Sequence, residues 1–288
     1  MCKNSHLFRN SYVRAVLWMQ LSILTSCLND VITKYLATRL PACQICFFRF
    51  CFGSLVLLPI GCYKYALTTT RFTLHLVRGF FLAVAMGLYC YGLAYVPMST
   101  AIVIGFTNPV FVLILANIFL RENISWPIWL ATLLSFVAIV IVFQPTMVNH
   151  YMAALACIAA TVVFALLDVI NKRYISREPM LALLFFSNAV AAFCIFPFAY
   201  LSWQKPTLVQ LLSLGLLGIG SNLILYFLLR AFALAAVTAL APIKYTELLY
   251  SVLFGILFFN EWPLGTTYIG AACIIAATSF VAYYQNRL

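Results

Sequence analysis

Long apolar stretches follow one another along almost the whole chain, and only short polar or charged segments separate them. A helix needs roughly 20 predominantly apolar residues to cross the hydrocarbon core of a bilayer. The stretches have this length, and nothing between them leaves room for a separate soluble domain. The pattern therefore predicts ten transmembrane helices, at residues 12–36, 42–62, 72–95, 98–120, 125–144, 151–173, 179–200, 207–230, 236–259 and 263–284.

The composition agrees with this pattern. Hydrophobic residues make up 65% of the 288 residues, charged residues only 8%, and the mean hydropathy is +1.05. A soluble domain carries about 25% charged residues, which keep its surface hydrated. We therefore expect an all-α polytopic membrane protein whose surroundings are the lipid bilayer.

The polar positions repeat at about half the length of the chain. The segment 30–34 (Asp-Val-Ile-Thr-Lys) returns at 168–172 (Asp-Val-Ile-Asn-Lys), a shift of 138 residues. Each half then holds five predicted spans, and because five is odd, the second half enters the membrane from the opposite side. The sequence thus predicts an inverted 5+5 repeat, with halves at residues 1–146 and 147–288. Such a repeat lets one site face either side of a membrane.

The 17 lysines and arginines divide unevenly between the two sides of the membrane. Cytoplasmic segments carry an excess of these residues in membrane proteins. A cytoplasmic N-terminus gives such an excess and also places the C-terminus in the cytoplasm. The net charge of +11 then reflects topology, so no nucleic-acid partner is expected. The cytoplasmic side would hold Lys3, Arg9, Arg14, Lys64, Arg71, Arg78, Arg121, Lys172, Arg173, Arg177, Arg230 and Arg287, and the other side Lys34, Arg39 and Lys205.

Asp30 and Asp168 are the repeated carboxylates, and each lies within a predicted span. A charge inside a span costs several kcal/mol on insertion scales, so it usually has a partner or a function. A lysine follows each aspartate by four residues (Lys34 and Lys172), which makes an intrahelical ion pair one interpretation. The other is that the aspartates, on opposite sides of the midplane, hold a cationic substrate or act in alternate gates. Asn29 beside Asp30 favours a polar cavity there.

Three further charged residues lie deep within predicted spans: Arg49, Lys244 and Glu247. One interpretation is an ion pair, Arg49–Glu247 or Lys244–Glu247, that locks the two halves together. The other is that Arg49 binds a carboxylate as a two-pronged donor and Glu247 binds an ammonium. A site with both signs of charge suits a zwitterion better than a simple ion or a sugar.

Tyr91, Pro109 and Pro242 also stand out within the apolar pattern. Tyr91 lies about five residues inside its span, deeper than a usual interfacial tyrosine, and its ring could stack on a planar base. Pro109 and Pro242 interrupt the fourth and ninth spans. A proline at mid-span frees a backbone carbonyl, which is common where a helix lines a cavity.

Motifs of intramembrane enzymes are missing from the sequence. It contains no His-Glu-x-x-His, Gly-x-Gly-Asp or Gly-x-Ser-x-Gly. Most cysteines lie inside spans, where cysteine acts as a small packing residue. We therefore expect no enzymatic activity, no catalytic residue, no metal site and no cofactor.

The predicted helices, the repeat, and the glutamates that close the fourth and ninth spans resemble the drug/metabolite transporter superfamily, EamA type. The start of the fourth span, Pro97-x-x-Thr100-Ala101, belongs to the same resemblance. A narrower resemblance is to the S-adenosylmethionine carriers of obligate intracellular bacteria, the rickettsial and chlamydial type. It rests on Asn29-Asp30-Val31 with Lys34-Tyr35-Leu36, Phe47-Phe48-Arg49-Phe50, Leu167-Asp168 with Ile170-Asn171-Lys172, and Tyr245-x-Glu247-Leu248 after Ala241-Pro242.

The resemblance implies secondary-active import of S-adenosylmethionine across a bacterial inner membrane, in exchange for S-adenosylhomocysteine, by alternating access. Asp30, Asp168 and Glu247 would then serve the positive groups of the substrate. Arg49 would receive its carboxylate. A drug/metabolite or amino-acid exporter on the same scaffold is the alternative, and the coupling mode and oligomeric state stay open.

The resemblance also implies that Tyr91 or Phe48 receives the adenine of the substrate. Lys244 departs from the narrower family, which has an arginine at this position. Lysine keeps the positive charge but loosens the planar contact that arginine makes with a carboxylate.

Overall fold

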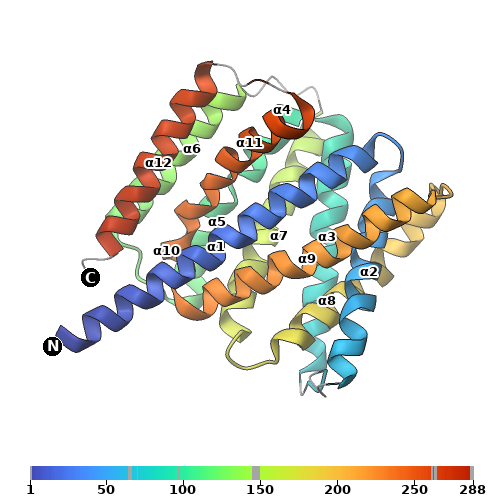
Figure 1. Ribbon diagram of the computed structural model, residues 1–288, viewed down its shortest axis with the longest axis horizontal. Helices are drawn as coiled ribbons and strands as arrows, with labels where there is room; N and C mark the ends of the chain where they lie inside the picture. The colour runs from blue at the N-terminus through green and yellow to red at the C-terminus, as the bar shows by residue number, and fades with distance from the viewer. Residues whose placement is uncertain are drawn as a thin grey trace.

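The computed structural model describes residues 2–63, 67–69, 71–96, 98–144, 150–260, 262 and 265–285 (Figure 1). This part of the chain is helical and contains no strand. Its elements are α1 (Cys2–Ala37), α2 (Ala42–Tyr63), α3 (Phe72–Tyr95), α4 (Met98–Gly105), α5 (Asn108–Leu120), α6 (Trp126–Phe143), α7 (Tyr151–Tyr174), α8 (Met180–Leu201), α9 (Leu208–Leu234), α10 (Val237–Leu240), η1 (Ala241–Thr246), α11 (Glu247–Phe259) and α12 (Gly265–Gln285).

The predicted spans correspond to these helices. Within the described residues, nine segments are long and apolar enough to cross a membrane, and the apolar stretch of α12, Gly265–Val281, is shorter. Large apolar side chains such as Leu134 and Phe193 are exposed on the outside of the bundle. Lipid tails suit such a surface better than water does. The prediction of an all-α polytopic membrane protein is confirmed, whereas the inverted orientation of the halves and the side on which the termini lie stay predictions.

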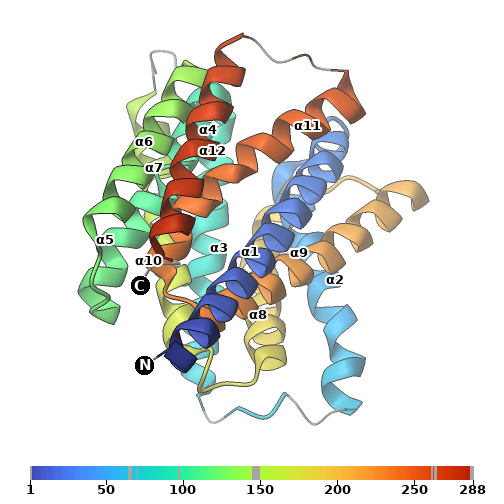
Figure 2. The same cartoon turned by 60° about the vertical axis from the view of Figure 1, so that its left-hand side comes forward.

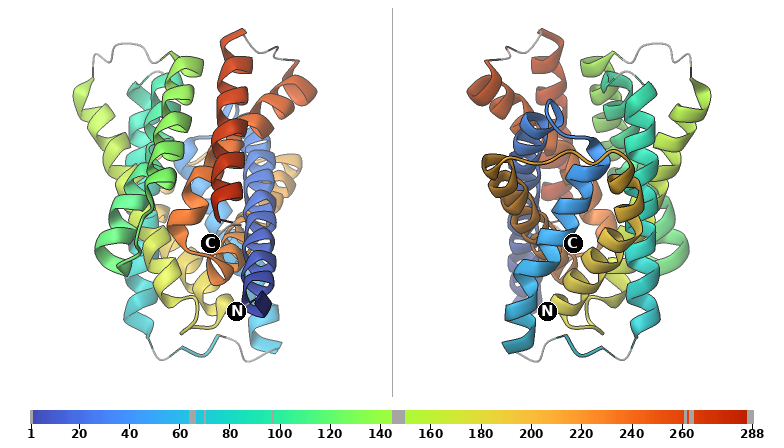
Figure 3. Two further views of the ribbon diagram at one scale, coloured as in Figure 1. Left: turned by 90° about the vertical axis from the view of Figure 1, so that its left-hand side faces the viewer. Right: turned by 90° about the vertical axis from the view of Figure 1, so that its right-hand side faces the viewer.

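Helices of the first predicted half pack mainly against helices of the second. Helix α1 runs along α9, α2 along α8, α3 along α7, and α6 along α12. Figures 2 and 3 show these pairs side by side, with the described ends of α1 and α12 toward the same end of the bundle. The main buried contact surface therefore lies between the halves, where a site can be enclosed by both.

The fourth and ninth predicted spans are each broken at a proline. Pro109 occupies the first turn of α5, where its missing N–H cannot bond back to α4, and the chain bends at Thr107. Pro242 lies in η1, a 3-10 segment between α10 and α11. The prediction that both prolines interrupt their spans is confirmed. Each break leaves the end of one short helix and the start of another inside the bundle.

Glu122, which closes the fourth predicted span, contacts the start of α10. The carboxylate of Glu122 accepts hydrogen bonds from the backbone N–H of Thr238 at 3.1 Å and from its hydroxyl at 2.7 Å. This contact satisfies a donor at the start of α10 that has no partner within the helix. Arg121 and Asn260 both have left-handed backbones, with φ of 55° and 54°, so the repeat preserves the turn that ends α5 and α11. Glu261, the glutamate that closes the ninth predicted span, lies outside the described residues.

Gly53 and Gly218 let the backbones of α2 and α9 touch. A Cβ atom on Gly218 would lie 2.7 Å from the backbone nitrogen of Gly53. We expect Gly218→Ala to lower the free energy of unfolding by ~1–3 kcal/mol, because the two helices must move apart. Thermal unfolding of the purified protein in detergent measures this loss.

Gly215→Ala, on the same helix, is the matched control for Gly218→Ala. A Cβ atom on Gly215 would meet no atom within 4 Å. Removing a helical glycine there should leave stability unchanged or raise it by up to ~1 kcal/mol. Equal losses in the two variants would contradict the close contact between α2 and α9.

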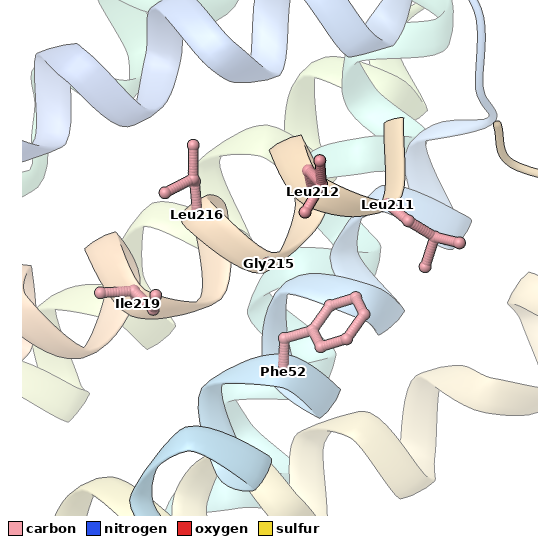
Figure 4. A pocket seen from close by; sticks show the side chains of 6 residues that line it. All are labelled: Phe52, Leu211, Leu212, Gly215, Leu216 and Ile219. Atoms are coloured by element: carbon pink, nitrogen blue, oxygen red, sulfur yellow. The ribbon is translucent and has the colours of Figure 1, made fainter. Parts of the chain in front are cut away.

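An apolar groove lies on the outer side of α9 beside α2 (Figure 4). Leu212 and Leu216 are exposed, and every side chain that lines the groove is hydrocarbon. Substrate sites combine apolar walls with a few polar groups that fix orientation. This groove therefore suits lipid tails, and it lacks the polar groups of a ligand site. The groove is lined by Phe52, Leu211, Leu212, Gly215, Leu216 and Ile219.

Candidate functional site

Polar side chains from α1, α2 and α9 meet at the hydroxyl of Ser221. Arg49 donates from Nε to this oxygen, and Asn29 donates from Nδ2 at 3.4 Å. Ser221 itself donates to the carbonyl of Leu217 at 2.7 Å. A Cβ atom on the adjacent Gly220 would overlap the side chain of Asn29, so the glycine permits α1 to approach α9. Ser221 was not singled out from the sequence, although the Gly-Ser-Asn run at 220–222 interrupts an apolar span and could have indicated this polar position.

Asp30, on α1, is the fourth member of this group of polar residues. It interacts electrostatically with Arg49, and its side chain keeps exposed surface although it lies within a membrane span. A charged group that faces lipid at this depth would cost several kcal/mol. We infer that the exposed surface of Asp30 faces water between the helices and not lipid. We refer to Asn29, Asp30, Arg49 and Ser221 as the outer cluster, after the side of the membrane on which the predicted topology would place it.

A second group joins the two broken spans to α7. The ammonium of Lys244 donates to Asp168 Oδ2 at 2.5 Å and to Asn108 Oδ1 at 2.8 Å. The side chains of Lys244 and Asp168 are 20% and 11% exposed, so solvent screens this ion pair only partly. We refer to Asn108, Asp168 and Lys244 as the inner cluster.

The two lysines that follow the repeated aspartates have contacts of their own. Lys172 donates to two carbonyls at the C-terminal end of α9, at 2.5 and 2.6 Å. Lys34 lies over the ring of Phe259, 4.1 Å from its centroid. The interpretation of Asp168 and Lys172 as an intrahelical pair is therefore wrong. Lys244 supplies the cation for Asp168 across the helix interface, and Lys172 satisfies otherwise unpaired helix-end carbonyls.

Glu247 lies between the outer and inner clusters, at the first residue of α11. Its carboxylate interacts electrostatically with Asp30 and with Lys244, and it accepts a hydrogen bond from the side chain of Ser26. Tyr89 on α3 interacts electrostatically with both Asp30 and Glu247. Arg49 instead bonds to Ser221 and interacts with Asp30, so an ion pair between Arg49 and Glu247 is not observed. The clusters and Glu247 form one charged site inside the bundle.

Tyr91 and Phe48 make their contacts elsewhere. Tyr91 is 50% exposed, and its ring lies 5.2 Å from that of Tyr95. The ring of Phe48 packs against Trp203, with 5.2 Å between centroids. The structure does not bring these two rings to the charged site. Tyr89, which the sequence pattern did not distinguish from the other tyrosines of α3, is the one that reaches it.

The two repeated aspartates have different cationic partners. Arg49 serves Asp30 and Lys244 serves Asp168, and neither cation has a charged counterpart at the shift of 138 residues (Ser187 and Phe106). The two ends of the site are thus chemically unlike. Across the described residues, no group of three or more His, Cys, Asp or Glu side chains could hold a metal ion. The arrangement suits reversible binding of an organic molecule that carries charges of both signs.

Apolar helices that enclose a charged, water-accessible site define a membrane transport protein. The model of the EamA-like transporter family matches residues 13–144 and again residues 151–283. The chain belongs to this family, whose members are transporters and not enzymes.

Two relatives and one solved structure show the range of this resemblance. The S-adenosylmethionine uptake transporter of Rickettsia conorii is 41% identical over 279 residues, 96% of this chain and 95% of that protein. The pseudopaline exporter of Pseudomonas aeruginosa is 27% identical over 265 residues, 91% of this chain and 93% of that protein. One crystal structure matches with a TM-score of 0.83 at 18% identity, covering 95% of this chain and 98% of its own, which supports the fold.

Proposed function

We propose that this transporter imports S-adenosylmethionine across a bacterial inner membrane, in exchange for S-adenosylhomocysteine. The observation that carries the proposal is the enclosed site with three carboxylates and two cations, which suits a ligand with both signs of charge. The 41% identity to a rickettsial uptake transporter over nearly the whole chain supports this substrate.

Within this proposal, each charged group of the substrate meets its complement. The guanidinium of Arg49 binds the substrate carboxylate as a two-pronged donor. Asp30, which interacts with Arg49, and Glu247 attract the ammonium and the sulfonium. Tyr89 offers an aromatic face to the adenine, since stacking accepts any planar base. The surrounding apolar helices separate the site from the lipid, and the charged side chains select the ligand.

Alternating access follows from the two proposed halves, residues 1–146 and 147–288. The breaks between α4 and α5 and between α10 and α11 place backbone that is not α-helical beside the site, where discontinuous helices of transporters commonly bind their substrates. Rocking of one half against the other then exposes the site first to one side and then to the other.

Uptake into liposomes that contain the purified protein tests the proposal. We expect labelled S-adenosylmethionine to enter faster than in protein-free liposomes, and unlabelled S-adenosylhomocysteine inside the vesicles to accelerate entry. Uptake without this acceleration would remove exchange and keep import. Protein that unfolds cooperatively yet gives no uptake above the background would overturn the proposal.

An exporter is the second candidate, because a relative with 27% identity is a pseudopaline exporter. Direction distinguishes the two functions in intact cells. An importer makes cells accumulate labelled S-adenosylmethionine from the medium. An exporter leaves that accumulation unchanged and gives resistance to a toxic substrate.

A further inference from the structure

The negative charges of the site outnumber its positive charges. Three carboxylates face two cations: Lys244 pairs with Asp168, and Arg49 interacts with Asp30. Glu247 also interacts electrostatically with Lys244, but the hydrogen bonds of Lys244 go to Asn108 and Asp168. With every group in its ordinary charge state, the site carries one net negative charge.

Among the described residues, Lys244 is the cation that the interactions recorded for Glu247 bring to it. The groups that face it are Ser26, Cys27 and Asp30 from α1, Tyr89 from α3, and Lys244 from η1. Glu247 is the first residue of α11, so the helix dipole favours its negative charge, but this partial charge is smaller than that of a full cation. Glu247 is therefore the carboxylate of the site that has no cation of its own.

We propose that Glu247 is the counter-ion of the substrate sulfonium, and that it makes the site prefer a ligand with one net positive charge. This inference rests on the proposed function. S-adenosylmethionine carries a carboxylate, an ammonium and a sulfonium, which leaves one positive charge. Its demethylated product has a neutral thioether in place of the sulfonium and no net charge. The charge of the occupied site is balanced by the first ligand and not by the second.

Replacement of Glu247 by glutamine tests this assignment, because the amide keeps the size of the side chain and can still accept from Ser26. The measurement is competition against labelled S-adenosylmethionine uptake, which gives apparent affinities for both ligands. We expect the preference for S-adenosylmethionine over S-adenosylhomocysteine to fall at least ~10-fold in Glu247→Gln, mainly through weaker binding of the cation. Ligand-induced thermal stabilisation in detergent gives the same ratio if the variant transports too slowly.

Charge is separated from the methyl group by a third ligand, an analogue with a protonated amine in place of the methylsulfonium. It should lose affinity in Glu247→Gln as S-adenosylmethionine does, whereas the neutral thioether should keep its affinity. Glu178→Gln is the matched control. Glu178 accepts from Thr69 at 2.8 Å near the loop between α7 and α8, so its loss removes a buried carboxylate away from the site. The ratio of affinities should not change in this control.

The possible failures are distinct. Wild-type protein that binds neither adenosyl ligand would remove the proposed function itself. Wild-type import of S-adenosylmethionine with an unchanged affinity ratio in Glu247→Gln would remove only the role of Glu247. A ratio that falls equally in Glu178→Gln would also contradict it, because the effect would then not depend on position.

Discussion

Uptake of S-adenosylmethionine by the Arg49→Ala variant is expected to fall at least ~30-fold. Loss of one partner from a hydrogen-bonded charge pair costs about 2–5 kcal/mol in binding, and the carboxylate of the substrate would lose its only guanidinium. The variant also leaves Asp30 without the cation that interacts with it. Initial rates of labelled uptake in proteoliposomes, at equal amounts of reconstituted protein, measure the effect.

Two further variants separate charge and geometry from a general loss of arginine. Arg49→Lys keeps the charge and loses the planar fork, so its uptake should lie between those of wild type and Arg49→Ala. Arg39→Ala removes an exposed arginine whose guanidinium lies 5.0 Å from the ring of Tyr35, and uptake should stay near wild type. Normal uptake by Arg49→Ala would show that the outer cluster does not bind the substrate.

The second large effect is expected at the ion pair between Lys244 and Asp168. Asp168→Asn should lower the free energy of unfolding by about 3 kcal/mol, because a partly buried ammonium is left without its carboxylate. Lys244→Gln should cost a similar amount for the converse reason. The double variant should cost less than the sum of the two by about 1–3 kcal/mol, since both charges are then removed together. Denaturation of the four proteins in one detergent gives this coupling energy.

The pair Arg71–Glu178 provides the control for that cycle. Its charged atoms are 3.8 Å apart and the side chain of Arg71 is 45% exposed, although that of Glu178 is only 2% exposed, so its coupling should be smaller than that of Lys244 and Asp168. Strictly additive losses at Lys244 and Asp168 would contradict a direct ion pair. Uptake should stay low in the double variant, because the charges of the inner cluster are missing there as well.

The positions of the helices and of their breaks could be predicted from local pattern. Apolar length is enough to define a span, and a proline within a span interrupts its hydrogen bonds wherever the helix packs. The charged residues of the site were also recognisable individually, because Arg49, Lys244 and Glu247 are costly in a membrane unless they have a partner or a function.

Their pairing could not be predicted in the same way. Spacing along one helix suggests Lys172 for Asp168, whereas the partner observed, Lys244, lies 76 residues away in sequence. Tyr89 and Tyr91 illustrate a second limit. Two residues turn a helix by about 200°, so only one of them can face the site, and the sequence alone does not fix the rotation of α3.

The contacts of Lys244 have a kinetic consequence. This side chain fastens the break of the fourth span, the break of the ninth span and α7 to one another. Rearrangement of the unoccupied carrier must pull the ammonium away from at least one of these oxygens, whereas a bound ligand offers hydroxyl oxygens of its own that can replace the lost acceptor. We therefore expect the unoccupied carrier to return slowly and the occupied one to cross quickly. A carrier of this kind would exchange ligands between the two sides of the membrane without changing the total amount of ligand on either side.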